Sequence, residues 1–348
     1  MKPAKATNGH EAGDLTKFES TPGRFAMRWS KFTVILALGL VALLPCVAWA
    51  ADRTIGVGAQ GLSSPVPSRM ANEWRNVCDA KGWDILTVDG GGDMQKVIDA
   101  ALTWVQMGVD AIHIFLPPAG SIGELAEACA TAGIPLITTG YGCGQGQTFD
   151  VGMSDFEGGV KMTQWLFDAL GRVGDIAVLH WDQVPCPRQR YGMLEAMLPE
   201  FPDITVAASH VAQFPGAGES CRAAMENILL AHPEIDGVWG AWDELTMGAV
   251  QAIEVAGRDD IICVGIDGNK STFDAIRSGG PFKMTIAPDW EGGVTIALAE
   301  LEARLWQGQP PLQPQFYIDI PIVTAANCPP AGWFYGEWVA AGMPDTSK

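Results

Sequence analysis

Nine short apolar runs separated by amphipathic segments restrict the fold of this chain more than any other feature. The runs are nearly continuous in hydrophobic residues, as is typical of strands that are covered on both faces. In segment 93–108, Val97, Ala101 and Trp104 recur at helical spacing, which predicts an amphipathic helix. The predicted strands are residues 54–59, 84–89, 110–115, 134–139, 175–181, 204–208, 237–241, 261–267 and 283–288. Alternating strands and helices predict an α/β fold of parallel sheets joined by crossover helices.

Two parts of the chain repeat one layout, which favours two similar lobes. Residues 110–140 and residues 236–268 each run from a strand through a loop and a helix to a Gly-containing turn and a second strand. With 348 residues, of which 48% are hydrophobic, the chain is long enough for two medium domains. A single eight-stranded barrel is the alternative that the same alternation allows.

The first 50 residues have the pattern of a secretory signal peptide. Basic residues precede the apolar run 32–44, and Ala48-Trp49-Ala50 follows it as a small-residue cleavage site. Met27 is an alternative start that would give a signal of ordinary length. The apolar run is shorter than the roughly 20 residues that a membrane-spanning helix needs. We therefore expect cleavage after Ala50 and a periplasmic protein.

The charge and the motifs exclude several functional classes. The formal net charge is −18, whereas nucleic-acid binding requires clustered Lys and Arg side chains against phosphate groups. The sequence has no spacing of His, Cys, Asp and Glu that is typical of a metal site, and no G-x-S-x-G or similar nucleophile motif. The sequence therefore predicts no nucleic-acid partner, no metal, no cofactor and no enzymatic activity.

One glycine-rich segment raises the question of a dinucleotide site. Residues 56–61 read G-V-G-A-Q-G, which formally matches the G-x-G-x-x-G fingerprint. That fingerprint requires a helix to begin at the last glycines, so that its N-terminus meets the pyrophosphate. Pro65 and Pro67 disfavour a helix in the residues before them, so we expect the helix to begin near Ser68. The segment is better interpreted as a strand that ends in a wide loop, at the sheet edge where α/β proteins bind ligands.

Two longer motifs give the chain a family resemblance. They are HPEIDGVWGAWDELTMGAVQAI at 232–253 and ICVGIDGNKSTFDAIRSG at 262–279. Together with the strand-end loops they resemble the type I periplasmic binding proteins, in particular the sugar-binding branch that includes ribose- and galactose-binding proteins. The resemblance covers about residues 53–320. It implies two Rossmann-like lobes joined by a hinge: an N-terminal lobe of 51–153 plus 289–313, and a C-terminal lobe with tail of 154–288 plus 314–348.

The resemblance also implies a ligand site between the lobes. It assigns Asp267 to the sugar hydroxyls and Arg188 to the helix after the first strand of the second lobe. It places Asp93 near a polar contact, and Asp243 beside Trp242, which stands where an Asn is usual. The sequence departs from the family pattern at Val66 and Pro67, at Gly140 and Tyr141, and at Pro288.

Four aromatic residues lie at predicted strand ends, independently of the resemblance. They are Tyr141, Trp181, Trp242 and Trp290. Aromatic rings at such positions can stack on a sugar, a polyol or a cation, and neighbouring carboxylates and guanidinium groups can bind hydroxyls. The alternative is that each ring fills core space.

Two cysteines of the second lobe are candidates for a disulfide. Cys186 and Cys221 follow consecutive strands, which a right-handed crossover should place side by side. A Cα separation below about 7 Å is then feasible, as a disulfide requires. The alternative is that both are buried free thiols.

These observations predict a periplasmic solute-binding protein that delivers a sugar or polyol to the permease of an ABC importer. Three alternatives remain at this point. A sensory protein of this fold would present its ligand, such as a quaternary ammonium or amine-oxide compound, to a membrane histidine kinase or chemoreceptor. An exported α/β enzyme and a sugar-responsive repressor are the other two.

Overall fold

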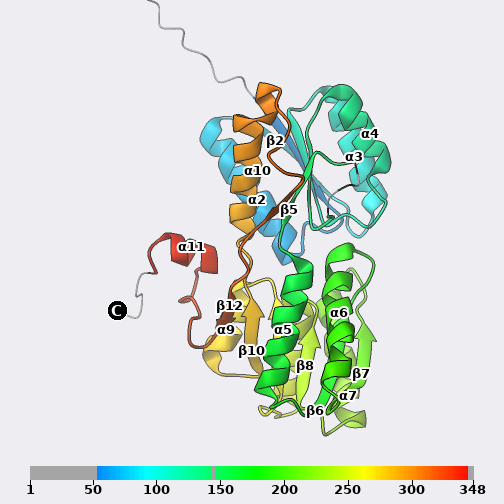
Figure 1. Ribbon diagram of the computed structural model, residues 1–348, viewed down its shortest axis with the longest axis vertical. Coiled ribbons are helices and arrows are strands. Elements are labelled where there is room, and N and C mark those ends of the chain that lie inside the picture. Colours follow the sequence, from blue (N-terminus) through cyan, green and yellow to red (C-terminus); the bar gives the residue numbers. More distant parts are fainter. Residues whose placement is uncertain (1–52, 143, 145, 344–348) are drawn as a thin grey trace, which may run out of the picture. The chain divides into compact units, whose positions relative to one another are not determined.

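The computed structural model describes residues 53–142, 144 and 146–343, and the predicted signal peptide lies outside them. The described residues form two α/β lobes (Figure 1). The first lobe contains β1 (Thr54–Ala59), α2 (Pro65–Lys81), β2 (Asp84–Asp89), α3 (Met94–Met107), β3 (Ala111–Phe115), α4 (Gly123–Ala132), β4 (Leu136–Thr139), β5 (Phe149–Gly152), α10 (Trp290–Ala303) and β11 (Gln315–Tyr317). The second lobe contains α5 (Asp155–Ala169), β6 (Gly174–His180), α6 (Pro185–Met197), β7 (Ile204–Val211), α7 (Ala217–Ala231), β8 (Gly237–Gly240), α8 (Asp243–Val255), β9 (Ile262–Ile266), α9 (Lys270–Ser278), β10 (Phe282–Ile286) and β12 (Ile322–Thr324). A final helix, α11 (Tyr335–Ala340), follows β12.

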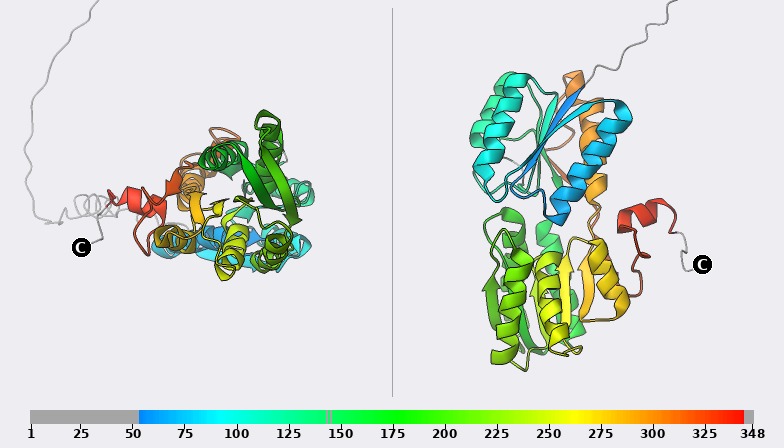
Figure 2. Two further views of the ribbon diagram at one scale, coloured as in Figure 1. Left: turned by 90° about the horizontal axis from the view of Figure 1, so that it is seen from below. Right: turned by 180° about the vertical axis from the view of Figure 1, so that it is seen from behind.

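Each lobe has a six-stranded sheet with helices on both faces (Figures 1 and 2). The strand orders are β11-β5-β4-β3-β1-β2 and β12-β10-β9-β8-β6-β7. Neighbouring strands pair in parallel, except that β12 runs antiparallel to β10. The two separate open sheets confirm the predicted pair of Rossmann-like lobes, and the single-barrel alternative is wrong. Among the described residues, no helix is both long and apolar enough to cross a membrane.

All nine predicted strands are present, with ends that differ by up to three residues. The strands inside the sheets are largely buried, as the continuous apolar runs require, whereas the edge strands β2 and β7 are mostly exposed or half-buried. The sequence did not predict β5, β11 and β12. These strands have only three or four residues, too few for a periodic pattern to emerge.

The chain passes between the lobes three times, and the passages are hydrogen-bonded to one another. They follow β5, β10 and β11. The N–H of Ile318 donates to the carbonyl of Gly152 at 3.0 Å, which joins the third passage to the first. The N–H of Ala287 donates to the carbonyl of Pro321 at 2.9 Å, which joins the second passage to the third. The passages therefore form one connected ribbon between the lobes.

The position of the third passage corrects one predicted boundary. The sequence placed this boundary between residues 313 and 314. Strand β11 still belongs to the first sheet, where Phe316 is paired with Val151 of β5. The chain therefore enters the second lobe only after Tyr317, because a further strand is needed to complete the edge of the first sheet.

Gly56 and Gly58 of the glycine-rich segment allow helix α3 to pack closely against β1. A Cβ atom on Gly56 would lie 2.5 Å from the ring of Trp104, and one on Gly58 would lie 2.8 Å from Val97. Helix α2 begins at Pro65 rather than near Ser68, because proline fits the first turn of a helix, where an N–H has no intrahelical partner. Since Pro65 and Pro67 have no N–H, the start of α2 offers few donors to a pyrophosphate.

A buried histidine lies in the core of the first lobe. The ring of His113 accepts a hydrogen bond from the indole N–H of Trp74 at Nδ1, over 3.0 Å. Its Nε2 lies 2.9 Å from the hydroxyl of Thr139. Because Nδ1 faces a donor, the neutral ring with its proton on Nε2 is the form that fits this site. Burial lowers the pKa of His113 from 6.5 to about 3.

We expect His113 to make the fold less stable at acidic pH. The unfolded chain takes up this proton near pH 6.5 and the folded chain only near pH 3, so the free energy of unfolding falls as the pH drops through this interval. The expected result is a flatter pH dependence in His113→Gln, measured by urea denaturation between pH 3.5 and 7. Groups other than His113 contribute to both proteins and cancel in the difference. Equal slopes in both proteins would contradict the prediction.

Candidate functional site

A pocket lies between the lobes, where loops after strands of both sheets meet. This is the sheet edge at which α/β proteins bind ligands. The first lobe contributes Ala59, Gln60, Gly61, Ser64, Pro65, Val66, Pro67, Phe115 and Leu116. The second lobe contributes Trp181, Val184, Cys186, Pro187, Arg190, Phe214, Trp242, Glu244 and Asp267, and Trp290 begins α10. The glycine-containing loop after β1 therefore lines the pocket, as the sequence predicted.

Four of the eight predicted ligand residues line this pocket, namely Trp181, Trp242, Asp267 and Trp290. Trp181 directly follows β6 and Asp267 directly follows β9, while Trp242 lies two residues after β8 and Trp290 is the first residue of α10. A residue just past a buried strand has little freedom to turn away from the sheet edge. This explains why strand-end reasoning located Trp181 and Trp242, whereas Asp267 was assigned by the family resemblance.

The other four predicted residues lie elsewhere. The carboxylate of Asp93 is exposed and accepts from the N–H of Gln95, as a cap of α3. The hydroxyl of Tyr141 accepts from the N–H of Gly120 at 2.9 Å, and this ring packs in the core of the first lobe. Arg188 is exposed and donates to the carbonyl of Asp182. These three side chains are not among the residues that line this pocket.

Asp243 is a buried structural residue. Its carboxylate accepts from the Thr285 hydroxyl at 2.8 Å and from the Asn269 N–H at 3.1 Å. Burial raises its pKa to about 6. The next residue, Glu244, is the one that lines the pocket. Sequence reasoning missed Glu244 because the start of α8 turns successive side chains to different sides.

Arg190 takes the place that the sequence assigned to Arg188. It lies one helical turn after Cys186 on α6, and both side chains line the pocket. Its Nε donates to Asp155 at 2.7 Å, and Nη1 donates to the carbonyl of Ala241 at 2.8 Å. Arg190 and Asp155 are both about 5% exposed. Helical periodicity from Cys186 was the signal that could have identified Arg190.

Asp267 combines burial, charge and an unusual backbone conformation. It is 6% exposed and has a φ angle of +148°, a region that is costly for residues other than glycine and is often found at functional sites. Its pKa is raised well above the usual range, first by burial and then by the neighbouring charge of Asp243. Arg190 and Arg69 act in the opposite direction. A carboxyl group in this setting can accept a hydrogen bond from a ligand hydroxyl or donate one to it.

Aromatic rings form one wall of the pocket. The ring of Trp181 lies 5.3 Å from Phe214 and 6.3 Å from Trp242, measured between ring centroids. Trp290 is 2% exposed, and its indole N–H has no hydrogen-bond partner among the described residues. A buried donor without a partner is costly, so a ligand acceptor at this point would be stabilised.

The family assignment follows from a comparison with known sequences. The family described as the periplasmic binding protein domain matches residues 55–309. The chain belongs to this family. This periplasmic binding protein is 27% identical to the ribose import binding protein of Bacillus subtilis over 261 residues, 70% of this chain and 83% of the relative. It is 27% identical to the xylitol-binding protein of Mycolicibacterium smegmatis over 262 residues, 72% of this chain and 74% of the relative.

Solved structures show the same fold for this periplasmic binding protein. An ABC transporter solute-binding protein from Agrobacterium vitis with bound allitol superposes with a TM-score of 0.73 at 22% identity. The match covers 80% of this chain and 97% of the other. At this identity the likeness supports the type I periplasmic binding protein fold. The family is one of binding proteins, in agreement with the prediction that the chain is not an enzyme.

The predicted disulfide between Cys186 and Cys221 is absent. Both thiols are free and buried. Cys186 lines the pocket, where its sulfur lies 3.8 Å from the position of a Cβ atom on Gly140. Cys221 lies in α7, where burial and then the charge of Glu244 raise the pKa of its thiol to about 12. The prediction failed because adjacent strands do not fix the direction of side chains on the helices that follow them. No group of His, Cys, Asp and Glu among the described residues could hold a metal ion.

Proposed function

We propose that this periplasmic binding protein captures a sugar or polyol in the pocket between its lobes and delivers it to the permease of an ABC importer. The observation that supports the proposal is the combination of the neighbouring rings of Trp181 and Trp242 with buried Asp267 and Arg190 in one pocket. Aromatic faces bind the C–H faces of a sugar, and charged groups bind its hydroxyls in fixed directions. Similar proteins are named for ribose, for xylitol and for bound allitol, and each of these compounds has both C–H groups and several hydroxyls.

We further propose that residues 1–50 direct export and that cleavage after Ala50 releases the protein into the periplasm. The described residues begin three positions after this site, at Arg53. Mass spectrometry of protein purified from the periplasm tests the proposal. A mature chain that begins at Ala51 is expected, and retention of the apolar run 32–44 would contradict it.

A thermal-shift screen tests the ligand class. Pentoses, hexoses, pentitols and hexitols are compared with choline and trimethylamine N-oxide, after unfolding and refolding have removed any bound molecule. A ligand present at about 100 times its dissociation constant stabilises the fold by about 2.7 kcal/mol. We expect a clear increase in melting temperature with at least one sugar or polyol. A shift with choline or trimethylamine N-oxide alone would replace this proposal with a sensor or importer of quaternary ammonium or amine-oxide solutes.

A further inference from the structure

The charged groups around the pocket all come from one lobe. Among the lining residues the ionisable side chains are Arg190, Glu244 and Asp267, and each belongs to the second lobe. The first lobe contributes as polar groups the side chains of Gln60 and Ser64 and the indole N–H of Trp290, and none of these is charged. One N–H of the Gln60 amide donates to the carbonyl of Gly92 at 2.7 Å, which ties this side chain to its own lobe.

The remaining first-lobe wall is apolar. It is built by Val66, Pro67, Phe115 and Leu116, of which Val66 and Phe115 are fully or almost fully buried. A hydroxyl held against such a wall loses its hydrogen bonds to water without replacement. A methyl group or another deoxygenated carbon at the same place gains from burial.

Building on the proposed function, we propose that the ligand is a partly deoxygenated sugar or polyol, such as a deoxy or methylated one. Its hydroxyls face Arg190, Glu244 and Asp267 of the second lobe. Its apolar edge faces Val66 and Phe115 of the first lobe. The division of polar and apolar side chains between the lobes also fixes the orientation in which the ligand enters.

Calorimetry with matched ligand pairs tests this inference. The pairs are D-galactose with D-fucose, L-galactose with L-fucose, and D-ribose with 5-deoxy-D-ribose. In the pair that binds most tightly, we expect the deoxy member to bind at least tenfold more tightly than its parent. Val66→Ser should reduce this preference, whereas Val173→Ser, at a site that is 62% exposed, should leave it unchanged.

The outcomes separate this inference from the proposed function. If the parent sugars bind as tightly as the deoxy sugars, the apolar edge is refuted while sugar capture stands. If Val66→Ser leaves a measured preference unchanged, the assignment of the first-lobe wall is refuted. If no sugar or polyol binds, both proposals fall.

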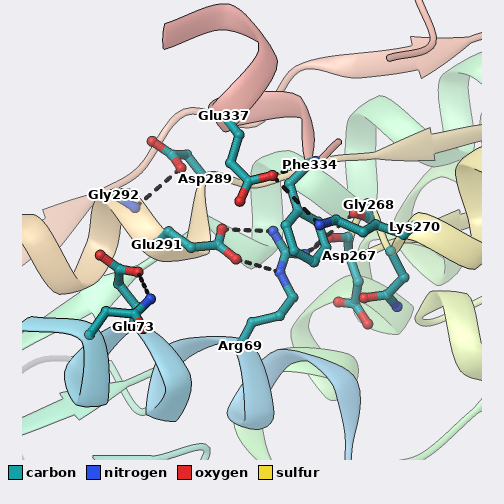
Figure 3. A network of polar contacts seen from close by, with 12 residues as sticks. Arg69, Glu73, Asp267, Gly268, Lys270, Asp289, Glu291, Gly292, Phe334 and Glu337 are labelled. Atoms are coloured by element: carbon teal, nitrogen blue, oxygen red, sulfur yellow. Dashed lines mark hydrogen bonds and ion pairs between the residues drawn. The ribbon is translucent and has the colours of Figure 1, made fainter. Parts of the chain in front are cut away.

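A different set of contacts supports a second inference, about the segment after β12 (Figure 3). The ring centroid of Phe334 lies 3.8 Å from the guanidinium carbon of Arg69, on α2 of the first lobe. The same ring lies 4.0 Å from Nζ of Lys270, on α9 of the second lobe. Glu337 accepts from the N–H of Phe334 and pairs with Lys270 at 3.7 Å. One aromatic ring thus touches a cation from each lobe.

Arg69 itself connects the lobes beside the pocket. Its guanidinium binds the carboxylate of Glu291 on α10 through two hydrogen bonds of 2.8 Å. Its Nη1 also donates to the carbonyl of Asp267 in the second lobe at 3.0 Å. Asp267 lines the pocket, so Phe334 contacts the arginine that holds a pocket residue (Figure 3).

We infer that Phe334 and Arg69 are positioning residues that hold the two lobes together over the pocket. Separation of the lobes would break the contact of Arg69 with Asp267 and would part the two cations on the Phe334 ring. The contacts within each lobe would remain. Phe334 therefore stabilises the arrangement of the lobes rather than the fold of either lobe.

Small-angle X-ray scattering of the ligand-free full-length mature protein tests this role. Phe334→Ala is expected to have a larger radius of gyration than the wild type at an unchanged melting temperature. Phe334→Tyr keeps an aromatic face and should restore the wild-type value. Val339→Ala, at an exposed position of α11, is the matched control. If Phe334→Ala scatters as the wild type does, or if Val339→Ala shows the same increase, the inference is refuted.

Discussion

Replacement of Asp155 by alanine is expected to lower the free energy of unfolding by about 3–5 kcal/mol, because removal of one partner of a buried ion pair leaves the other charge uncompensated. Asp155 and Arg190 are bonded at 2.7 Å and are both 5% exposed. Without the carboxylate, the hydrogen-bond partners of Arg190 are the uncharged carbonyl of Ala241 and sulfur of Met153, and Asp267, whose own pKa is raised by burial, is a nearby acidic group. Urea denaturation measures the loss.

A double variant separates the unpaired charge from the loss of packing. Asp155→Leu combined with Arg190→Met removes both charges, and we expect it to be more stable than Asp155→Ala. Asp168→Ala removes an exposed partner of Arg172 and serves as a control with little expected effect. A single variant that is no less stable than this control would contradict the argument, as would a double variant less stable than Asp155→Ala.

Asp267→Asn is expected to weaken ligand binding at least tenfold, about 1.4 kcal/mol, because the amide replaces an oxygen that can accept or donate with an NH₂ group that only donates, and a buried ligand hydroxyl left without its partner costs about 1–3 kcal/mol. The fold should be unharmed or slightly stabilised. The charge of Asp243 raises the pKa of Asp267, so the neutral amide removes a repulsion between the two carboxylates.

The test of Asp267→Asn measures ligand binding and stability separately. Calorimetry with the best sugar or polyol of the screen measures binding, and thermal denaturation without ligand measures stability. Asp93→Asn is the matched control, because Asp93 lies outside the pocket and asparagine also caps helices. An unchanged affinity in Asp267→Asn would remove Asp267 from the site.

The sequence predicted the strands well where burial on both faces produces a continuous run of apolar residues. Continuous apolar runs located β1 and β8 because both faces of these strands are covered. Trp181, which directly follows β6, was located for the same reason, whereas Asp267 was assigned by the family resemblance. The helix starts were less predictable, because a helix turns each successive side chain by about 100°. Arg188 and Arg190 are close in sequence, but only Arg190 points into the pocket.

Contacts between the two lobes could not be predicted, because they join residues that are far apart in the sequence. The contact of Arg69 with Asp267 joins residues that are almost 200 positions apart. No local pattern reveals such a pair. The same holds for Phe334, whose segment lies beyond the range of the family resemblance.

The hydrogen-bonded ribbon of three passages has a mechanical consequence. A single covalent link would let the lobes swivel freely, whereas adjacent links joined by hydrogen bonds resist torsion. Rotation of one lobe about the long direction of the ribbon would stretch the bond from Ile318 to Gly152 and the bond from Ala287 to Pro321. Bending across the ribbon leaves both intact. The ribbon therefore favours hinge bending of the lobes over twisting. With hinge bending, Arg190, Glu244 and Asp267 return to the same apolar first-lobe side chains each time the lobes close.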